Sequence, residues 1–332
     1  MTSLRNHLLD VPGLTIGHAQ DLRLASGVTA ILFEEPVVAS VAVVGGAPAG
    51  RDLECLEPDR TVEGVDAIVL SGGSAFGLDA ASGVQAYLRE QGRGFLVRSV
   101  RVPIVPQAIC FDLLNGGDKD WGRYPPYREL GYAAASAAGQ DLSLGTVGGG
   151  TGATTVNLKG GVGAASAVTA ARHTVAAIVV VNAIGSAVVD GGPHFWAGPH
   201  EIGDEFGGLG PSRSASRPLR WKGAPEPATT IALVATDAML TKAQAKRLAL
   251  VAQGGLAKGL SLSHAMTDGD IVFAASTGRR SLSDPLNELI ELGALAATCL
   301  ARAIARGVHE ATALPFPGAL PAWKDRFADR SG

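Results

Sequence analysis

Six runs rich in valine and isoleucine, bounded by glycine, set the strongest limit on how this chain can fold. Such runs predict buried strands. Helical periodicity fills several of the intervals between them. Because strands often follow strands directly, the order favours sheets packed face to face with helices outside over a doubly wound parallel sheet. The predicted strands cover residues 28–33, 38–46, 66–73, 176–190, 229–237 and 271–277, and the predicted helices cover 74–91, 241–256 and 284–308.

The composition disfavours several classes of partner. The 332 residues carry a net charge of −3 and their lysines and arginines do not cluster, so we expect no nucleic-acid binding. The most apolar run, 176–190, is interrupted by Asn182 and Gly185 and is short for a membrane span, so we expect no membrane role. The 3 cysteines and 7 histidines are scattered, which predicts no disulfide framework and no metal site. A cytoplasmic location is the simplest interpretation.

A long segment without periodicity, residues 192–227, ends at two threonines that open an apolar strand. Loops of this length in compact proteins are usually functional or processed. The structural interpretation is that Thr229 and Thr230 simply start a strand, as threonine often does. In the functional interpretation, cleavage of the Ala228–Thr229 bond gives Thr229 a free α-amine with a pKa near ~8. That amine can act as general base for the hydroxyl beside it.

Two glycine-rich turns are candidates for substrate contact. The turn "GTVGGGTGATTVN" at 145–157 lacks the Lys-Ser/Thr ending of a P-loop and the first-strand context of a dinucleotide site. Its backbone amides at Gly150, Thr151 and Gly152 could instead face a developing oxyanion. The turn "LSGGSAFGLDAA" at 70–81 is either a packing turn or a helix N-terminus that meets a carboxylate or oxyanion.

Two further polar positions have both a structural and a functional interpretation. Asn182 interrupts a Val/Ile run, where an unpaired amide costs ~1–3 kcal/mol, so it makes either a structural hydrogen bond or an oxyanion contact. Asp268 and Asp270 flank a glycine in "MTDGD", just before a predicted strand. They fit a turn, or a carboxylate that orients an amine or a hydroxyl.

Seven motifs, in this order, resemble those of one family. They are "DVPGLTIGHA", "LSGGSAFGLDAASGV", "VPIVPQAICFDL", "GTGAT", "VVVNAIGSAVVD", "ATTIALVATDA" and "DGDIVFA". Over roughly residues 9–310 the chain closely resembles the L-aminopeptidase D-Ala-esterase/amidase family, whose relatives include β-peptidyl aminopeptidases and the nylon-oligomer hydrolase. The resemblance implies an α/β fold of four layers, an αββα sandwich like that of N-terminal nucleophile hydrolases.

The same resemblance implies a self-processing hydrolase of short amides or peptides that needs no cofactor. Its nucleophile matches Thr229, so a single domain, 1–332, would divide into an α part, 1–228, and a β part, 229–332. The family pattern also implies a homo-oligomer, a tetramer of αβ units.

Roles for other residues follow from the matched motifs. Asn182 matches a residue that supports the oxyanion, and Asp268 matches an acid near the amine of the nucleophile. A tyrosine of the family's active site lies near Tyr124 or Tyr127. We expect Asn182 to act together with the backbone amides of the glycine-rich turn.

The chain departs from the family at three positions. Ala228 precedes the nucleophile where Asn or Gly is familiar, and Met266 stands where relatives hold Ser or Asp. Asn157 stands where some relatives carry a lysine, and Lys159 is nearby. Two alternatives stay open: an acyltransferase of the ornithine acetyltransferase type, which shares the fold and a threonine nucleophile, and a small-molecule-binding member that never cleaves, which the departures at Ala228 and Met266 favour. A dinucleotide-dependent enzyme ranks last.

Overall fold

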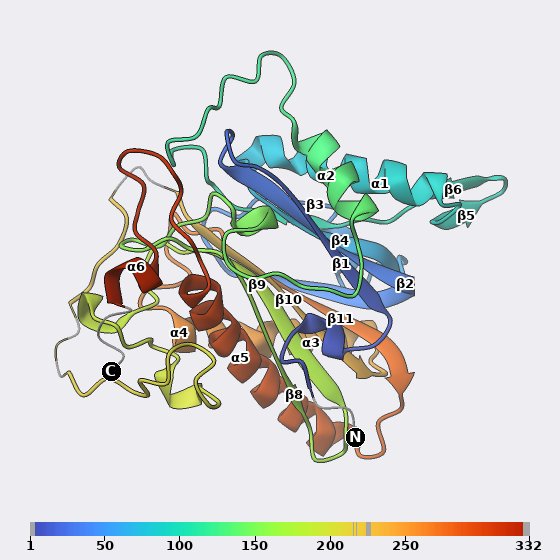
Figure 1. Ribbon diagram of the computed structural model, residues 1–332. Coiled ribbons are helices and arrows are strands. Elements are labelled where there is room, and N and C mark those ends of the chain that lie inside the picture. The colour runs from blue at the N-terminus through green and yellow to red at the C-terminus, as the bar shows by residue number, and fades with distance from the viewer. Residues whose placement is uncertain (1–3, 215, 217, 224–226, 328–332) are drawn as a thin grey trace.

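Two β-sheets lie between two layers of helices in the computed structural model of the chain (Figure 1). The structure describes residues 4–214, 216, 218–223 and 227–327. The strands are β1 (Leu14–Asp21), β2 (Ser26–Val43), β3 (Gly50–Arg51), β4 (Val65–Ser71), β5 (Phe95–Val97), β6 (Val100–Val102), β7 (Gln107–Ile109), β8 (Val162–Val168), β9 (Thr174–Asn182), β10 (Thr229–Ala238) and β11 (Ile271–Arg280). The α-helices are α1 (Ala80–Glu90), α2 (Tyr127–Ser136), α3 (Lys242–Ala252), α4 (Gly254–Gly259), α5 (Pro285–His309) and α6 (Trp323–Phe327).

Apart from β5 and β6, which pair with each other as a separate hairpin, the strands of the described residues form one continuous path that folds into two facing layers. Their order is β3-β7-β4-β2-β11-β10-β9-β8, with β1 paired to β2. Helices α1 and α2 cover the face formed by β1, β2 and β4, and helices α3, α4 and α5 cover the opposite layer (Figure 1). The expected four-layer αββα sandwich is confirmed.

The buried apolar residues form three cores, one between the two sheets and one between each sheet and its helices, and the alternation of side chains along each strand explains them. In β10, Ile231 and Leu233 point into the core between the two sheets, whereas Ala232 and Val234 face the helices. Successive side chains of a strand point to opposite faces, so a strand buried on both sides needs a nearly continuous apolar sequence. This is why "TTIALVATD" carries no polar face and marks a central strand.

The predicted helices 74–91 and 284–308 are present, whereas the predicted helix 241–256 is divided at Gln253 into α3 and α4. Thr241 caps α3 through a capping box with Gln244, and α5 starts after Asp284 and spans 25 residues. The segment 74–91 begins as a 3-10 turn, Ser74–Asp79, before α1. Within the part of the chain that the structure describes, no helix combines the length and the apolar character needed to cross a membrane.

Strand β2 joins two runs that the sequence analysis treats as separate strands. Glu34, Glu35 and Pro36 are exposed in the middle of β2, where its pairing with β4 shifts in register. Proline lacks a backbone donor, so this stretch reads as a break in the sequence. The strand continues because its second half pairs with β11, and β2 thus carries the chain from one sheet to the other.

The prediction of strand across the whole run 176–190 is wrong. Strand β9 ends at Asn182, and the following residues make only isolated bridges, at Ser186 and Val188. Gly185 lies against the backbone of Ser261, since a Cβ atom there would be 1.7 Å from the Ser261 carbonyl oxygen. The chain therefore leaves the sheet just after Asn182 and forms the edge at which the candidate site lies.

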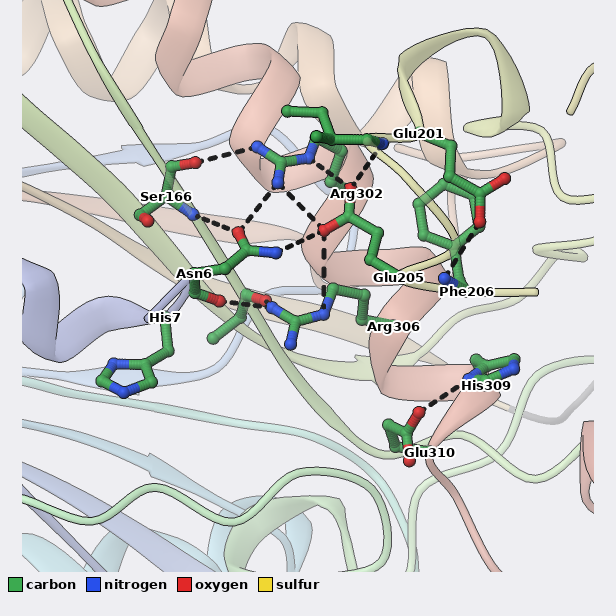
Figure 2. A network of polar contacts seen from close by, with 12 residues as sticks. Asn6, His7, Ser166, Glu201, Glu205, Phe206, Arg302, Arg306, His309 and Glu310 are labelled. Atoms are coloured by element: carbon green, nitrogen blue, oxygen red, sulfur yellow. Dashed lines mark hydrogen bonds and ion pairs between the residues drawn. The ribbon is translucent and has the colours of Figure 1, made fainter. Parts of the chain in front are cut away.

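A buried polar network ties α5 to the first part of the chain (Figure 2). The Arg302 guanidinium donates to both carboxylate oxygens of Glu205, at 2.6 and 2.9 Å, and to Asn6 Oδ1 at 2.8 Å. It also donates to the Ser166 carbonyl at 2.9 Å. Arg302 is only 2% exposed, so these partners are needed to stabilise its buried positive charge.

Candidate active site

The three residues expected to carry the chemistry meet at one edge of the sheet. Strand β10 starts at Thr229, which pairs with Asn182 at the end of the antiparallel neighbour β9. Strand β11 runs parallel to β10, so the loop before β11 reaches the same edge, and Asp268 pairs with Ala228 there. Parallel neighbours begin, and antiparallel neighbours end, at one edge of a sheet, which brings these distant segments together.

The peptide bond between Ala228 and Thr229 is held by two donors. The Thr229 hydroxyl donates to the Ala228 carbonyl oxygen at 2.5 Å, and the Gly269 amide donates to the same oxygen at 2.9 Å. A Cβ atom at Gly269 would lie 2.6 Å from Thr229 Oγ1. The nucleophile candidate is therefore buried against the carbonyl that it would attack, with a backbone donor on the oxygen that would become negative.

Asn182 is fully buried and its amide is oriented at both ends. Its Oδ1 accepts from the Thr154 amide at 3.0 Å and from Lys222 Nζ at 3.5 Å, and its Nδ2 donates to the Phe111 carbonyl at 2.8 Å. These contacts account for the polar residue inside the apolar run. A primary amide carries a second N–H, which leaves the group able to donate once more.

Asp268 is buried beside Asp270. It is 1% exposed, and among the described residues neither of its carboxylate oxygens accepts a hydrogen bond of good geometry. Burial, and then the neighbouring Asp270 carboxylate, raise the pKa of Asp268 to about 8. Near pH 7 the protonated form of the Asp268 carboxyl is therefore favoured.

Asp270 differs from Asp268 because it is well supplied with donors. Its Oδ1 accepts from the Thr230 amide at 2.9 Å, and its Oδ2 accepts from the His264 amide at 2.8 Å. The His264 ring also lies close, with Nδ1 at 3.1 Å from Oδ2.

Two backbone amides of the glycine-rich turn form hydrogen bonds within the turn itself. The Gly150 amide donates to Val147 and the Thr151 amide donates to Gly148, so these two amides close the turn. Gly152 lines the neighbouring cavity. Of the three positions expected near an oxyanion, Gly152 is thus the one that lines the cavity.

Lys159 supports this turn from inside. Its ammonium donates to the carbonyls of Gly150, Ala153 and Gly160 at 2.9, 2.8 and 2.7 Å. Complete burial lowers the pKa of Lys159 to about 7.

A cavity of about 520 Å³ lies beside the cleavage position. Pro227, which directly precedes Ala228, is part of its wall, and Lys222 contributes to the same wall. Asp112 and Lys159 lie at its polar side. A volume of this size holds a small organic molecule or a short peptide.

The two candidate tyrosines lie away from this cavity. Tyr127 is fully buried, and its hydroxyl donates to Ser26 Oγ at 3.0 Å. Ser26 in turn donates to Asp112 Oδ2 at 2.6 Å, so Tyr127 supports the cavity from behind. Tyr124 is 77% exposed on the surface. Asn157 accepts from Ser186 Oγ at 3.1 Å and borders a neighbouring hollow.

Three residues of this region had no assigned role in the sequence analysis: Asp112, Lys222 and His264. Asp112 ends a short strand-like motif, "AICFD", and that position could have marked it. Lys222 lies in the segment without periodicity, where no local pattern signals a site. His264 stands six residues before Asp270, a spacing that acquires meaning only when the loop folds back.

Comparison with known proteins identifies close relatives of this chain. A family model described as Peptidase family S58 matches residues 6–319. An uncharacterized aminopeptidase of Mycobacterium tuberculosis (strain ATCC 25618 / H37Rv) is 39% identical over 351 residues, which cover 98% of this chain and 99% of the relative. An uncharacterized aminopeptidase of Mycobacterium leprae (strain TN) is 38% identical over 356 residues, with coverages of 96% and 97%.

Solved structures share the fold. A β-aminopeptidase from Burkholderia sp. superposes with a TM-score of 0.72 at 23% identity, covering 99% of this chain and 94% of that one. The L-aminopeptidase D-Ala-esterase/amidase of Ochrobactrum anthropi, described as a new variant of the N-terminal nucleophile hydrolase fold, gives a TM-score of 0.69 at 19% identity, with coverages of 99% and 96%. These matches do not favour the acyltransferase alternative.

Proposed function

The chain belongs to peptidase family S58 and is a hydrolase of the aminopeptidase and amidase type, and we propose that Thr229 becomes its N-terminal nucleophile by self-cleavage after Ala228. The processed enzyme then hydrolyses short peptides or amides. The observation that carries the proposal is the contact of the Thr229 hydroxyl with the Ala228 carbonyl, at the start of a rigid central strand.

Self-cleavage proceeds as an N-to-O acyl shift followed by hydrolysis. Thr229 Oγ1 attacks the Ala228 carbonyl carbon and loses its proton, and the Gly269 amide stabilises the negative oxygen. The C–N bond then breaks as the Thr229 nitrogen takes up a proton. Water hydrolyses the resulting ester, which releases the Ala228 carboxylate and restores the Thr229 hydroxyl, now beside a primary amine.

Turnover uses the new amine as general base. It accepts the hydroxyl proton while Oγ1 attacks the carbonyl carbon of the substrate, and it returns a proton to the leaving amine. Water then releases the acyl group from Thr229. In this scheme Asn182 donates its second amide hydrogen to the oxyanion, and Asp268 holds the amine through a hydrogen bond or an ion pair.

The burial of Asp268 supports this role. An isolated carboxyl in an apolar site is costly unless a partner arrives. Cleavage creates a cationic group on Thr229, whose neighbour Ala228 is paired with Asp268 in the uncleaved chain. The site thus has a place for the charge that cleavage produces.

Intact-mass spectrometry with N-terminal sequencing tests the proposal. We expect two fragments, of about 23 and 11 kDa when the 33.8 kDa of the whole chain is divided in proportion to 228 and 104 residues, and a chain that starts at Thr229. The Thr229→Ala variant should remain full length and lose amidase activity, whereas Thr230→Ala, a matched change one residue further on, should still be cleaved. Turnover by uncleaved Thr229→Ala protein would contradict the mechanism.

We also propose that the enzyme works as a homo-oligomer in a reducing compartment. One face of the β5–β6 hairpin carries Phe95, Val97, Val100 and Val102, all exposed, and a two-stranded hairpin alone is only marginally stable in water. The cysteines are all unpaired. Light scattering on the purified protein measures the assembly directly, and a monomer would contradict this proposal.

A further inference from the structure

A second, apolar hollow adjoins the cavity at the segment that precedes the nucleophile. Its volume is about 350 Å³, and three separate parts of the chain form its wall. Ile184 follows β9, Leu219 and Trp221 lie before β10, and Leu262 and Met266 lie in the loop before β11. Trp221 also lines the larger cavity, so it stands between two compartments of different chemistry.

The hollow reaches the bond that the proposed cleavage breaks. Thr267 is part of its wall, and the Thr267 carbonyl accepts from the Ala228 amide at 3.2 Å. The wall is held by contacts that do not involve the Ala228–Thr229 bond. The Lys222 amide donates to the Ile184 carbonyl at 2.9 Å, and Lys222 Nζ donates to the Thr154 carbonyl at 2.9 Å. We therefore expect the hollow to persist in the processed enzyme.

Met266 presents an exposed apolar side chain on a fixed backbone. The side chain is 87% exposed. The backbone is closely packed, since a Cβ atom at Gly46 would lie 2.6 Å from the Met266 carbonyl oxygen. The preceding carbonyl, that of Ala265, accepts from the amides of Gly46 and Asp268 at 3.2 and 3.0 Å. A methionine in such a position adapts its shape to different apolar groups.

Leu262 lines the same hollow from a strained backbone. Its φ is +75°, in the left-handed region, which bulky residues rarely adopt. Two hydrogen bonds between the backbones of Ser261 and Ser186, at 2.8 and 3.2 Å, hold this turn in place. Strained residues of this kind persist where the surrounding structure imposes them, and they are concentrated at functional sites.

The charges indicate which part of a substrate enters which compartment. The acyl part of an aminopeptidase substrate carries a free ammonium group, which is costly to bury without a partner. The larger cavity has the carboxyl of Asp112 in its wall. Among the described residues that line the hollow, none has a carboxyl group, and Lys222 contributes a positive charge. The ammonium group is therefore favoured in the larger cavity, and the hollow suits an uncharged, apolar group.

We infer that the hollow is the leaving-group subsite of this hydrolase and that Met266 makes it select peptides whose second residue has an apolar side chain. The inference rests on the proposed function, in which Thr229 forms an acyl-enzyme. The leaving residue occupies the hollow while its C–N bond to the acyl group breaks, so apolar contacts there stabilise the transition state of acylation. Exposed apolar groups of the wall, Leu219, Trp221 and Met266, lose their contact with water at the same time.

The test compares two peptides that share the acyl part and differ in one side chain, L-alanyl-L-leucinamide and L-alanylglycinamide. We expect wild-type kcat/KM to be at least about tenfold higher for the leucine peptide. Met266→Ser should reduce this preference about fivefold, and Met266→Leu should preserve it. Met239→Ser is the matched control, because Met239 is an exposed methionine that follows the opposite end of β10, and the preference should be unchanged.

Equal wild-type rates on the two peptides would overturn the inference. So would a Met266→Ser variant that loses the same factor on both, since that result indicates a merely structural role. Should Met266→Ser fail to fold, the wild-type preference and the Met266→Leu variant decide. The N-terminus of the β part tests the proposed function separately, so a processed, active enzyme without the preference contradicts the inference alone.

Discussion

The hydroxyl of Thr229 donates to the carbonyl oxygen of the residue directly before it, Ala228, at 2.5 Å. Gly269 lies against the same hydroxyl, since a Cβ atom at position 269 would be 2.6 Å from Thr229 Oγ1, so the nucleophile candidate is closely packed. The geometry around this one peptide bond leads to the following predictions.

A methyl group at position 269 should block self-cleavage. In Gly269→Ala the new Cβ atom would lie 2.6 Å from Thr229 Oγ1 and 2.9 Å from the Ala47 carbonyl oxygen. Displacing a reacting group by ~1 Å can cost ~100-fold in rate, so we expect processing to slow to at least that extent. The measurement is a time course on a denaturing gel. Gly139→Ala, where a methyl group would meet open space, is the control and should be cleaved normally.

Asp268 should make the uncleaved protein less stable as the pH rises. Its pKa is raised to about 8 in the folded chain, against ~3.9 for an ordinary aspartate. Its contribution to stability is therefore complete below about pH 4 and is lost as the pH rises through about 8. We expect the Tm of Thr229→Ala protein to fall between pH 5 and 8, and Asp268→Asn in the same background to remove part of that fall. Parallel Tm curves for the two proteins would argue against a buried, protonated Asp268.

Removing the amine of Lys159 should destabilise the glycine-rich turn. Lys159→Met leaves three buried carbonyls without their donor, which we expect to cost about 2–4 kcal/mol of unfolding free energy. Urea denaturation measures the loss. Lys258→Met, at an exposed position of α4, should change the unfolding free energy by less than about 0.5 kcal/mol. An equal effect of both variants would contradict a specific role for Lys159.

Breaking the buried ion pair between Glu205 and Arg302 should be costly. Glu205→Ala leaves the guanidinium of Arg302 buried without its carboxylate, and such changes cost about 3–5 kcal/mol. Glu310→Ala removes partly exposed contacts with Lys324 and His309, and an exposed pair of this kind is worth about 0–1 kcal/mol. Thermal unfolding of the two variants side by side measures the contrast, and similar losses would show that burial does not set the energy of these pairs.

The two parts of a cleaved chain should stay associated. After cleavage at Ala228, β10 still pairs with β9 of the α part, and β11 still pairs with β2. The Glu205–Arg302 pair also joins the two parts (Figure 2). We expect both fragments to co-elute in size-exclusion chromatography under native conditions and to separate only in denaturant. Separation without denaturant would mean that these contacts do not survive cleavage.

Local patterns anticipated much of the fold. The apolar sequence of β10 and the long periodicity of α5 predict those elements, because a buried strand and an amphipathic helix each leave a regular trace along the chain. Local sequence patterns mislead where contacts with residues distant in the sequence decide whether a strand continues or ends. Pro36 suggests a break in β2, but pairing with β11 carries the strand on. The run after Asn182 looks like strand, but the chain leaves the sheet there and Gly185 packs against the Ser261 backbone.

For the candidate site as well, sequence motifs indicate some residues, and the fold alone decides the contacts of others. Thr229, Asn182 and Asp268 were singled out from their own sequence motifs, and the sheet brings them to one edge. Tyr127 resembled a site tyrosine, yet α2 buries it behind the cavity. No motif pointed to His264, because its contact with Asp270 depends on a left-handed turn.

The sequence alone determined the layered α/β architecture, the family and the candidate nucleophile, since these depend on periodicity and on motifs that are continuous along the chain. Only the tertiary structure decided which polar groups surround that nucleophile. These contacts join residues that lie up to dozens of positions apart in the sequence. Strand pairing sets the distances between the polar groups, and burial and neighbouring charges set their protonation. The distances and protonation states of these groups are set only when the chain packs, so a short stretch of sequence does not predict them.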